Sequence, residues 1–413
     1  MPDKRKQGGP GRVPPSQDGA EQYAASDKGR ELATADFTVV QTADVHIDGG
    51  RFGGLNPETG RRTAWESAYR CWMAATRRAV DIQADAFLLG GDAFLNAWPR
   101  AEAVEMIADG LRLVASAGIP VVAVRGNHEL LGLPKGHRGP LDRFADIAGV
   151  QVVSEPGVVK LDCGLTVACL PWPRRSEMDL DDEDDAGTAD RAIVVADLAD
   201  QVANLGAPSV LLGHATVAEA RLGSARRGSE GLLAAALWEP LVSSELLDQG
   251  PWAAALLGHI HRRQRIGAKV YYCGSPDRVD FSEEGDEKAF SVVHVSGTEA
   301  VVEAVPTPAR VFRTVRGDKG IPDDLAPGTV VRLLVADRSV EADARRAVEA
   351  AGAIVARVVV DAKPASVVAT SDDATELTPL DALEAWAQAQ DLPEDLARSV
   401  LSLGRAIISG EER

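Results

Sequence analysis

Short apolar runs along the chain end repeatedly in a small cluster of glycine and polar residues. Three of them, FTVVQTADVH (37–46), ADAFLLGGDAF (84–94) and IPVVAVRGNHE (119–129), lie in the first third of the chain. Two more, PSVLLGHAT (208–216) and WAAALLGHIH (252–261), repeat the pattern later. Short apolar runs bounded by glycine are typical of buried strands. We therefore expect five buried strands with polar residues at their carboxyl ends.

Two stretches between the first three runs have apolar residues at helical spacing. They cover residues 63–80 and 103–118, and Gly118 is a suitable helix end for the second. Strands that alternate with helices predict an α/β fold. Ligands of such folds bind beyond the carboxyl ends of the strands, which is where each polar cluster falls.

Changes in composition predict four segments. Residues 1–35 are rich in glycine, proline and charge, which predicts a disordered tail before a main domain at 36–305. The acidic stretch 177–190 within this domain predicts a solvated loop. After a linker around 305–310, residues 308–368 predict a small β-α-β domain, and 369–413 predict a linker followed by two short helices.

The composition is that of a soluble protein with a sizeable core. Of the 413 residues, 45% are hydrophobic, and the formal net charge of −18 argues against a general basic coat for nucleic acid, although not against a local groove. The four cysteines form no CxxC pair and lie in apolar surroundings, which predicts reduced, buried thiols and a cytoplasmic location. No signal-like stretch opens the chain, and no run reaches the roughly 18 apolar residues of a membrane span.

The polar residues at the strand ends form a set with the chemistry of metal ligands. Five of the seven histidines belong to it. Nitrogen and carboxylate donors together suit Mn²⁺, Zn²⁺ or Fe²⁺ better than Ca²⁺. The set is too large for one tetrahedral site, whereas two ions about 3.5–4 Å apart with a shared carboxylate would use it fully. Its members are Asp44, His46, Asp92, Asn127, His128, His214, His259 and His261.

Neighbouring residues refine this hypothesis. Glycines at 90, 91, 126, 213 and 258 precede the candidate ligands, as expected where several backbones crowd around one small site. His128 directly follows Asn127 and is placed to give a proton to a leaving alkoxide. In an extended segment His259 and His261 would face the same way, one for each ion, while Ile260 points to the core.

The order of these motifs resembles the calcineurin-type metallophosphoesterase superfamily. D-x-H, G-G-D, G-N-H-E, G-H and G-H-x-H follow one another between residues 37 and 262. The resemblance implies a four-layer α/β/β/α sandwich. It further implies one metal site of Asp44, His46, Asp92 and His261 and a second of Asp92, Asn127, His214 and His259. Asp92 would bridge the two ions, and His128 would be a catalytic histidine that binds neither.

The next stretch, YYCGSPDRVDFSEEGDEKAFSVVHV, is similar to the nuclease subunit of the bacterial SbcCD complex, a relative of the Mre-type double-strand-break nucleases. This similarity implies a Mn²⁺-dependent 3′-to-5′ exonuclease and hairpin-opening endonuclease. It also implies a small C-terminal α/β capping domain and a terminal helix-loop-helix that binds an SbcC-type ATPase. We expect a homodimer, formed by helices of the catalytic domain, within a heterotetramer.

Two residues depart from the family pattern. Glu129 stands where the family usually has aspartate, and Leu95 stands where a polar residue or histidine is frequent. Neither is a predicted ligand. The Leu95 change puts in doubt how the substrate strand is held.

Several alternatives stay open. Arg226, Arg227, Arg262 and Arg263 are candidate DNA contacts, or else solvated loop charges. The C-terminal apolar stripes could pack on the chain's own core. The chain could also be a phosphatase, a cyclic-nucleotide phosphodiesterase or a scaffold without catalysis. It has no G-x-x-x-x-G-K-[ST] loop, so an ATP-driven function needs a second polypeptide.

Overall fold

The computed structural model describes residues 36–50, 52–134, 136–173, 188–220 and 241–360, together with 398 and 401. The predicted tail, most of the acidic loop and nearly all of 369–413 therefore lie outside the described residues. The chain divides into two compact units. The second unit comprises residues 315–323, 333–347 and 358–413, and the first comprises the rest.

A six-stranded sheet with the order β14-β13-β1-β2-β3-β4 forms one half of the first unit. β1 to β4 are parallel to one another. On the other side of β1, β13 is antiparallel to β1, and β14 is antiparallel to β13. The carboxyl ends of the parallel strands therefore meet at one edge of the sheet. The strands are β1 (Phe37–Thr42), β2 (Ala86–Leu89), β3 (Val121–Val124), β4 (Val150–Val153), β13 (Ala289–Ser296) and β14 (Glu299–Pro306).

A second six-stranded sheet has the order β11-β12-β10-β7-β6-β5. Its four inner strands are parallel and its edge strands are antiparallel to their neighbours. A separate two-stranded parallel sheet consists of β8 (Thr216–Val217) and β9 (Leu241–Val242). The sheet strands are β5 (Gly157–Lys160), β6 (Thr166–Leu170), β7 (Ser209–His214), β10 (Ala255–Gly258), β11 (Gln264–Ile266) and β12 (Val270–Tyr272).

Alternation along the strands divides the apolar side chains between three core layers. In β2, Leu88 lies in the core between the two sheets, whereas Phe87 and Leu89 face the helices. In β10, Leu256 lies between the sheets, and Leu257 faces the opposite helical layer. Because both faces of each sheet are covered, the inner strands read as continuous apolar runs.

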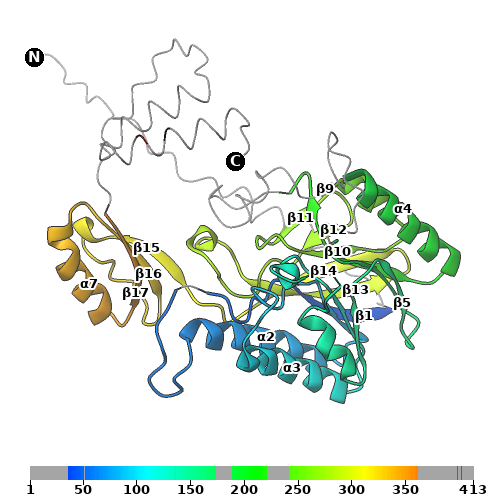
Figure 1. Ribbon diagram of the computed structural model, residues 1–413, viewed down its shortest axis with the longest axis horizontal. Helices are drawn as coiled ribbons and strands as arrows, with labels where there is room; N and C mark the ends of the chain where they lie inside the picture. The colour runs from blue at the N-terminus through cyan, green and yellow to red at the C-terminus, as the bar shows by residue number, and fades with distance from the viewer. Residues whose placement is uncertain are drawn as a thin grey trace, which may run out of the picture. The chain divides into compact units, whose positions relative to one another are not determined.

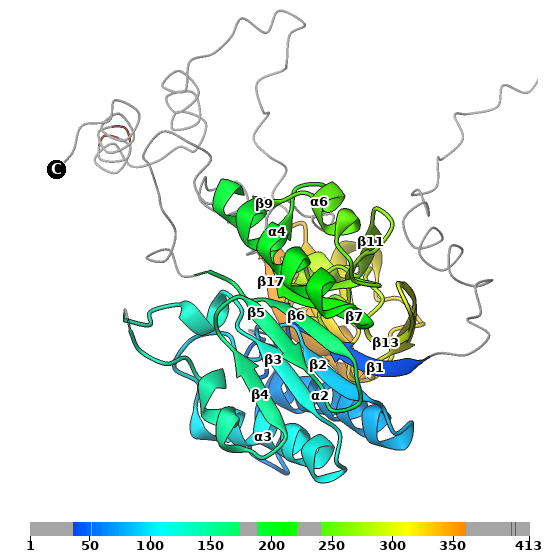
Figure 2. The same cartoon turned by 90° about the vertical axis from the view of Figure 1, so that its right-hand side faces the viewer.

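Helices cover the two outer faces (Figures 1 and 2). α2 (Thr63–Asp81) and α3 (Ala101–Ser116) pack on the first sheet, and α4 (Thr188–Leu205) and α6 (Ser244–Gln249) pack on the second. The predicted α/β fold is confirmed as a four-layer α/β/β/α sandwich. The predicted helices at 63–80 and 103–118 correspond to α2 and α3.

Residues 308–360 contain a small three-stranded sheet with the order β15-β16-β17. Its elements are β15 (Phe312–Arg316), β16 (Val330–Val335), α7 (Glu341–Ala350) and β17 (Ile354–Val360). The predicted β-α-β elements are β16, α7 and β17, and β15 was not foreseen. No helix in the described part of the chain is long and apolar enough to cross a membrane.

The four cysteines are free, but the prediction that all of them are buried is wrong for one. Cys71, Cys169 and Cys273 are buried, whereas Cys163 is exposed. Cys163 lies in the turn between β5 and β6, where the chain reverses at the surface.

Gly110 of α3 lies against Trp72 of α2, so a larger residue at position 110 would show how closely these helices pack. A Cβ at Gly110 would lie 2.2 Å from Trp72 Nε1 and 2.9 Å from Thr76 Cγ2. We expect Gly110→Ala to lower the free energy of unfolding by about 1–3 kcal/mol, although alanine is the better helix former. Urea unfolding measures this change.

Trp72→Phe provides the control, because phenylalanine lacks the ring atom nearest to Gly110. In that background the cost of Gly110→Ala should shrink. A stabilising Gly110→Ala would contradict the close contact between the helices.

Candidate metal centre

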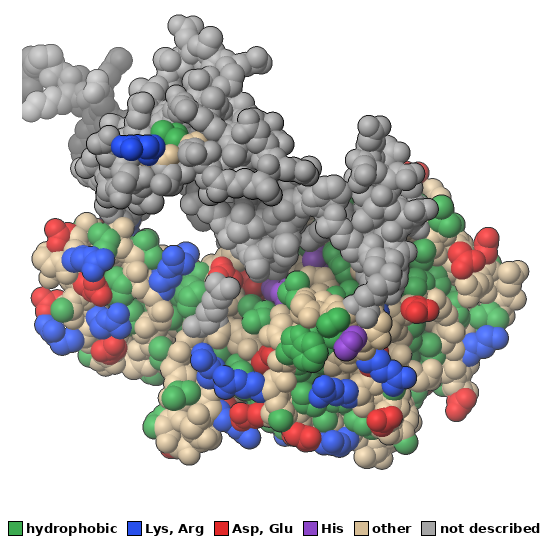
Figure 3. Space-filling view, viewed as in Figure 1, with side chains coloured by type: hydrophobic (Ala, Val, Ile, Leu, Met, Phe, Trp, Pro, Cys, Tyr) green, Lys and Arg blue, Asp and Glu red, His purple; other side chains and the backbone are tan. Residues whose placement is uncertain are grey.

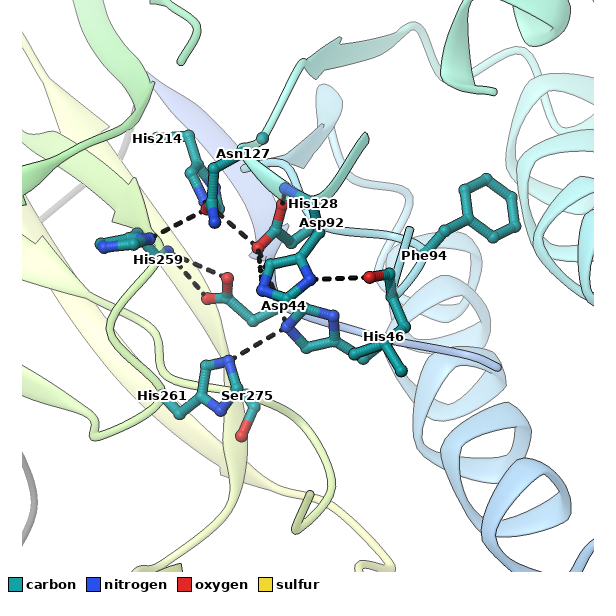
Figure 4. Close-up of polar contacts among 12 residues, drawn as sticks. Asp44, His46, Asp92, Phe94, Asn127, His128, His214, His259, His261 and Ser275 are labelled. Atoms are coloured by element: carbon teal, nitrogen blue, oxygen red, sulfur yellow. Dashed lines mark hydrogen bonds and ion pairs between the residues drawn. The ribbon is translucent and has the colours of Figure 1, made fainter. Parts of the chain in front are cut away.

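The eight side chains of the predicted site come together at the carboxyl ends of the parallel strands (Figure 4). The first sheet supplies Asp44 and His46 after β1, Asp92 after β2, and Asn127 and His128 after β3. The second sheet supplies His214 at the end of β7 and His259 and His261 after β10. The centre therefore forms where the two sheets bring their strand ends together.

Asp92 lies in the middle of the cluster. Its Oδ2 atom is 3.4 Å from His214 Nε2, 3.8 Å from His46 Nε2 and 4.0 Å from His128 Nε2. One carboxylate oxygen thus faces histidines that belong to both predicted metal sites, which is the placement expected of a bridging ligand.

The other candidate ligands fall into two groups around Asp92. Asn127 Oδ1 lies 2.9 Å from His214 Nε2 and 3.1 Å from His259 Nδ1. On the other side, His46 Nε2 lies 3.0 Å from His261 Nε2. These two groups are the ones that the family resemblance assigns to different ions.

Asp44 belongs to both groups in the structure. Its carboxylate oxygens lie within 4.8 Å of ligand atoms of His46 and His261, and likewise of Asp92 and His214. The backbone N–H of His259 donates to both of its oxygens at 2.9 and 3.0 Å. The geometry therefore does not restrict Asp44 to one ion.

Backbone strain is concentrated at the candidate ligands. In the described part of the chain, the non-glycine residues with positive φ are Gln83 and four candidate ligands. Such a conformation costs of order 1–3 kcal/mol per residue, and it persists where the surrounding structure imposes it. The four are Asp44 (φ 53°), His46 (41°), Asp92 (52°) and His259 (100°).

The positive φ of His259 corrects one argument from the sequence. β10 ends at Gly258, so His259 and His261 do not continue an extended strand, and that explanation of their common direction is wrong. Ile260 is buried as expected, with 1% of its surface exposed. His259 still lies beside Asn127 and His261 beside His46, because the chain turns between them.

Two of the predicted glycines have no room for a side chain. A Cβ at Gly126 would lie 2.0 Å from Asp92 Oδ1, and one at Gly258 would lie 2.2 Å from the carbonyl oxygen of Gly90. A side chain at either position would displace a loop that carries a candidate ligand.

Leu95 contributes through its backbone rather than its side chain. Its carbonyl oxygen lies 2.7 Å from His128 Nδ1, so the ring N–H donates to it and Nε2 faces the centre. Asp48 Oδ1 in turn accepts the Leu95 N–H at 2.8 Å. The departure from the family pattern at Leu95 therefore leaves the orientation of His128 intact.

Glu129, the second departure, connects two of the ligand loops. Its fully buried carboxylate accepts the backbone N–H groups of Asp92 at 3.1 Å, Phe94 at 3.2 Å and Gly126 at 2.8 Å. Burial, and then the nearby Asp92 carboxylate, raise the pKa of Glu129 to about 8. Sequence reasoning noted this residue but did not predict its contacts.

Charge and burial set the protonation of the cluster. Burial, and then the neighbouring His128, hold the pKa of His46 well below its usual range. Burial alone would lower the pKa of His214, but the Asp92 carboxylate raises it to about 9. Burial likewise raises the pKa of Asp44, whereas for Asp92 His214 and His128 outweigh burial and lower it.

His128 is the most accessible of the five histidines. Its side chain is 17% exposed, whereas His46, His214, His259 and His261 are buried. Histidine atoms are visible at the surface near the middle of the view in Figure 3. Among the described residues of the cluster, His128 is therefore the histidine most accessible to a substrate.

Trp172 is a residue of the site that sequence reasoning missed. It follows β6, and its ring centroid is 4.8 Å from that of His259 and 5.9 Å from that of His214. This half-buried ring forms one wall of the centre. Its position after another buried strand was the available signal.

Two of the four arginines predicted to contact DNA, Arg262 and Arg263, lie in the described part of the chain. Arg226 and Arg227 lie outside the described residues. The Arg263 guanidinium bonds Ser291 Oγ at 3.1 Å and the Cys273 carbonyl at 3.5 Å, which are internal contacts. Arg262 is half-buried close to the site.

The donor set fits two divalent ions. Three overlapping groups of aspartate and histidine atoms each lie within 4.8 Å of one another, and the residues that form them are buried except His128. Asn127 adds a neutral oxygen beside His214 and His259. Nitrogen and oxygen donors converging on a shared carboxylate are what Mn²⁺, Zn²⁺ or Fe²⁺ would need.

Comparison with known proteins identifies a family for the part of the chain that carries the cluster. Residues 37–263, more than half of the chain, match the family model described as calcineurin-like phosphoesterase. No curated protein matches the sequence. Three solved structures with low identity are similar over about two thirds of the chain.

A dimetal phosphatase from Danio rerio is 12% identical, covers 66% of this chain and 99% of its own, and has a TM-score of 0.40. TT1561 of Thermus thermophilus is 15% identical, with coverages of 66% and 99% and a TM-score of 0.37. The calcineurin-like phosphoesterase YfkN from Bacillus subtilis is 12% identical, with coverages of 65% and 88% and a TM-score of 0.35.

The contacts of Glu129 predict a large cost for its removal. Glu129→Ala would leave three buried N–H groups without an acceptor, so we expect the free energy of unfolding to fall by at least about 3 kcal/mol. Glu129→Gln keeps an acceptor oxygen and should cost less. Urea unfolding of both variants checks this, and equal stabilities of Glu129→Ala and wild type would refute it.

The raised pKa of His214 predicts that metal binding depends on pH. Below about pH 9 the metal-free ring is protonated, and an ion must displace this proton to bind. The apparent Mn²⁺ affinity should therefore rise by about tenfold per unit between pH 7 and 9 for each proton released. Calorimetry in buffers of different ionisation enthalpy counts the protons, and a pH-independent affinity would contradict the assignment.

Proposed function

Because the chain belongs to the calcineurin-like phosphoesterase family, we propose that it is a metal-dependent DNA nuclease of the SbcD type. It hydrolyses phosphodiester bonds as a 3′-to-5′ double-strand exonuclease and as a hairpin and single-strand endonuclease. The observation that carries the proposal is the convergence of the other seven predicted side chains around Asp92. The similarity of residues 271–295 to SbcCD nuclease subunits supports DNA as the substrate.

The chain's own residues would hold two ions, most simply Mn²⁺. His46 and His261 face one side of Asp92, Asn127, His214 and His259 face the other, and Asp44 lies beside both groups. When bound, such ions withdraw charge from a phosphoryl oxygen and make hydroxide available near neutral pH. The buried carboxylates offset the charge of the ions.

His128 supplies the proton for the leaving group in this proposal. Its Nδ1–H is held by the Leu95 carbonyl, so in the imidazolium form the proton to be transferred sits on Nε2, the ring nitrogen that faces Asp92. The 3′ oxygen of a nucleotide is a poor leaving group without protonation. A histidine that is oriented but accessible suits this role.

The proposal includes partners and a location. An SbcC-type ATPase would hold the DNA, which fits an acidic chain that offers few phosphate contacts of its own. Arg262, with Arg226 and Arg227, would contact the DNA backbone near the centre. The chain would act as a homodimer within a cytoplasmic heterotetramer, in DNA repair and recombination.

The proposal is tested on DNA and on small phosphoesters side by side. The purified chain with Mn²⁺, with and without an SbcC-type ATPase, should degrade blunt duplex DNA and open hairpins. Asp92→Asn should lose this activity at least a hundredfold, because the shared carboxylate is gone (about 2.7 kcal/mol). Intact DNA together with rapid hydrolysis of a phosphomonoester or cyclic nucleotide would replace the nuclease with a small-molecule enzyme.

The role of His128 predicts a dependence on the leaving group. His128→Ala should lower kcat on DNA by about 10²–10⁴-fold while Mn²⁺ binding stays unchanged. Hydrolysis of bis-p-nitrophenyl phosphate should suffer much less, because p-nitrophenolate leaves without a proton. Equal losses on both substrates would show that His128 orients the phosphate instead.

A further inference from the structure

His261 has a charged partner on the side that faces away from the centre. Its Nδ1 atom lies 2.9 Å from Glu283 Oε1, and the two side chains are each only 7% exposed. A carboxylate accepts but cannot donate, so the ring proton sits on Nδ1. The Nε2 lone pair is then directed at the centre, where His46 Nε2 lies 3.0 Å away.

Three other histidines of the centre are held differently. His214 Nδ1 contacts the carbonyl oxygen of Gly90 at 2.7 Å, and His128 Nδ1 contacts that of Leu95 at 2.7 Å. His46 Nδ1 is buried without a hydrogen-bond partner. Among the contacts described for these rings, the one to a carboxylate away from the centre belongs to His261.

Glu283 is itself fixed from several directions. Lys288 Nζ lies 2.6 Å from Oε2, the Ser275 hydroxyl 3.3 Å and the Val279 N–H 3.2 Å from the same oxygen. Lys288 also donates to the His261 carbonyl at 3.2 Å, so the ring and the backbone of His261 are held by one ion pair. Glu283 and Lys288 are each 5% exposed.

We propose that Glu283, held by Lys288, is a positioning residue that fixes the tautomer of His261 and strengthens its grip on one of the two ions. Glu283 lies on a short 3-10 turn, Phe281–Glu283, beyond the residues that match the family model. A carboxylate behind a ligating histidine raises the basicity of the ring, and its loss commonly weakens metal binding by about 10–100-fold. The inference rests on the dinuclear centre of the proposed function.

A structural ion pair would have the same contacts, so the test must separate the two roles. Removing Glu283 alone leaves the buried Lys288 with the more distant Asp286, 3.8 Å away, as its acidic partner, and loss of one member of a buried ion pair is itself destabilising. The variant is therefore Glu283→Leu combined with Lys288→Met, which removes both charges together and leaves no acceptor for the His261 Nδ1–H. Glu284→Gln is the matched control, because Glu284 bonds Thr314 and does not contact the centre.

The experiment measures Mn²⁺ binding to the full chain by calorimetry, and secondary structure by circular dichroism. We expect two ions in the wild type and in Glu284→Gln. In the double variant one ion should bind about 10–100-fold more weakly, while the other keeps its affinity. Unchanged affinity for both ions in a folded double variant would overturn the proposal.

A second measurement needs no variant and decides the matter if the double variant fails to fold. In the wild type loaded with diamagnetic Zn²⁺, nitrogen-15 NMR should show a slowly exchanging proton on His261 Nδ1, with Nε2 bound to the ion. A proton-free Nδ1 would overturn the proposal. A wild type that binds no pair of ions would instead refute the dinuclear centre, a separate outcome.

Discussion

Two buried carboxylates, Asp44 and Asp92, impose the main constraint on the first unit of this protein. Each is almost inaccessible to water, and a buried charge is tolerated only where hydrogen bonds and opposite charges compensate it. Backbone N–H groups of His259 and His128 supply part of this compensation, and the imidazole rings supply more. The loops that carry the ligands are therefore folded around these two side chains.

The sandwich makes this arrangement possible because each ligand loop begins at the end of a strand whose position is fixed by packing. Parallel strands at the centre of both sheets end at the same edge, and three apolar layers fix their positions. The strain at the ligand residues is localised in the few residues after each strand. Burial of the sheets provides the stability that offsets it.

Residues that surround the centre hold its loops and orient its histidines. Glu129 joins the loops after β2 and β3, Leu95 and Asp48 orient His128, and Glu283 orients His261. These residues come from different segments and touch no substrate in the proposed reaction. The candidate metal centre therefore depends on these supporting contacts as well as on its candidate ligands.

The sequence by itself indicated the α/β class, five of the buried strands and the eight side chains that the structure brings together. Apolar runs that end in glycine and ligand-type residues are local patterns, and five of them in a fixed order leave little freedom. Only the tertiary structure decided which supporting residues matter. Glu283 is one of four acidic residues among positions 283–287, and no local pattern distinguishes it from its neighbours. Two of the three N–H groups that Glu129 accepts lie 37 and 35 residues away, and Leu95 acts through a carbonyl that every residue has. Such contacts depend on which segments the fold brings together. Local sequence patterns do not contain the distances in space between residues that are far apart in the chain.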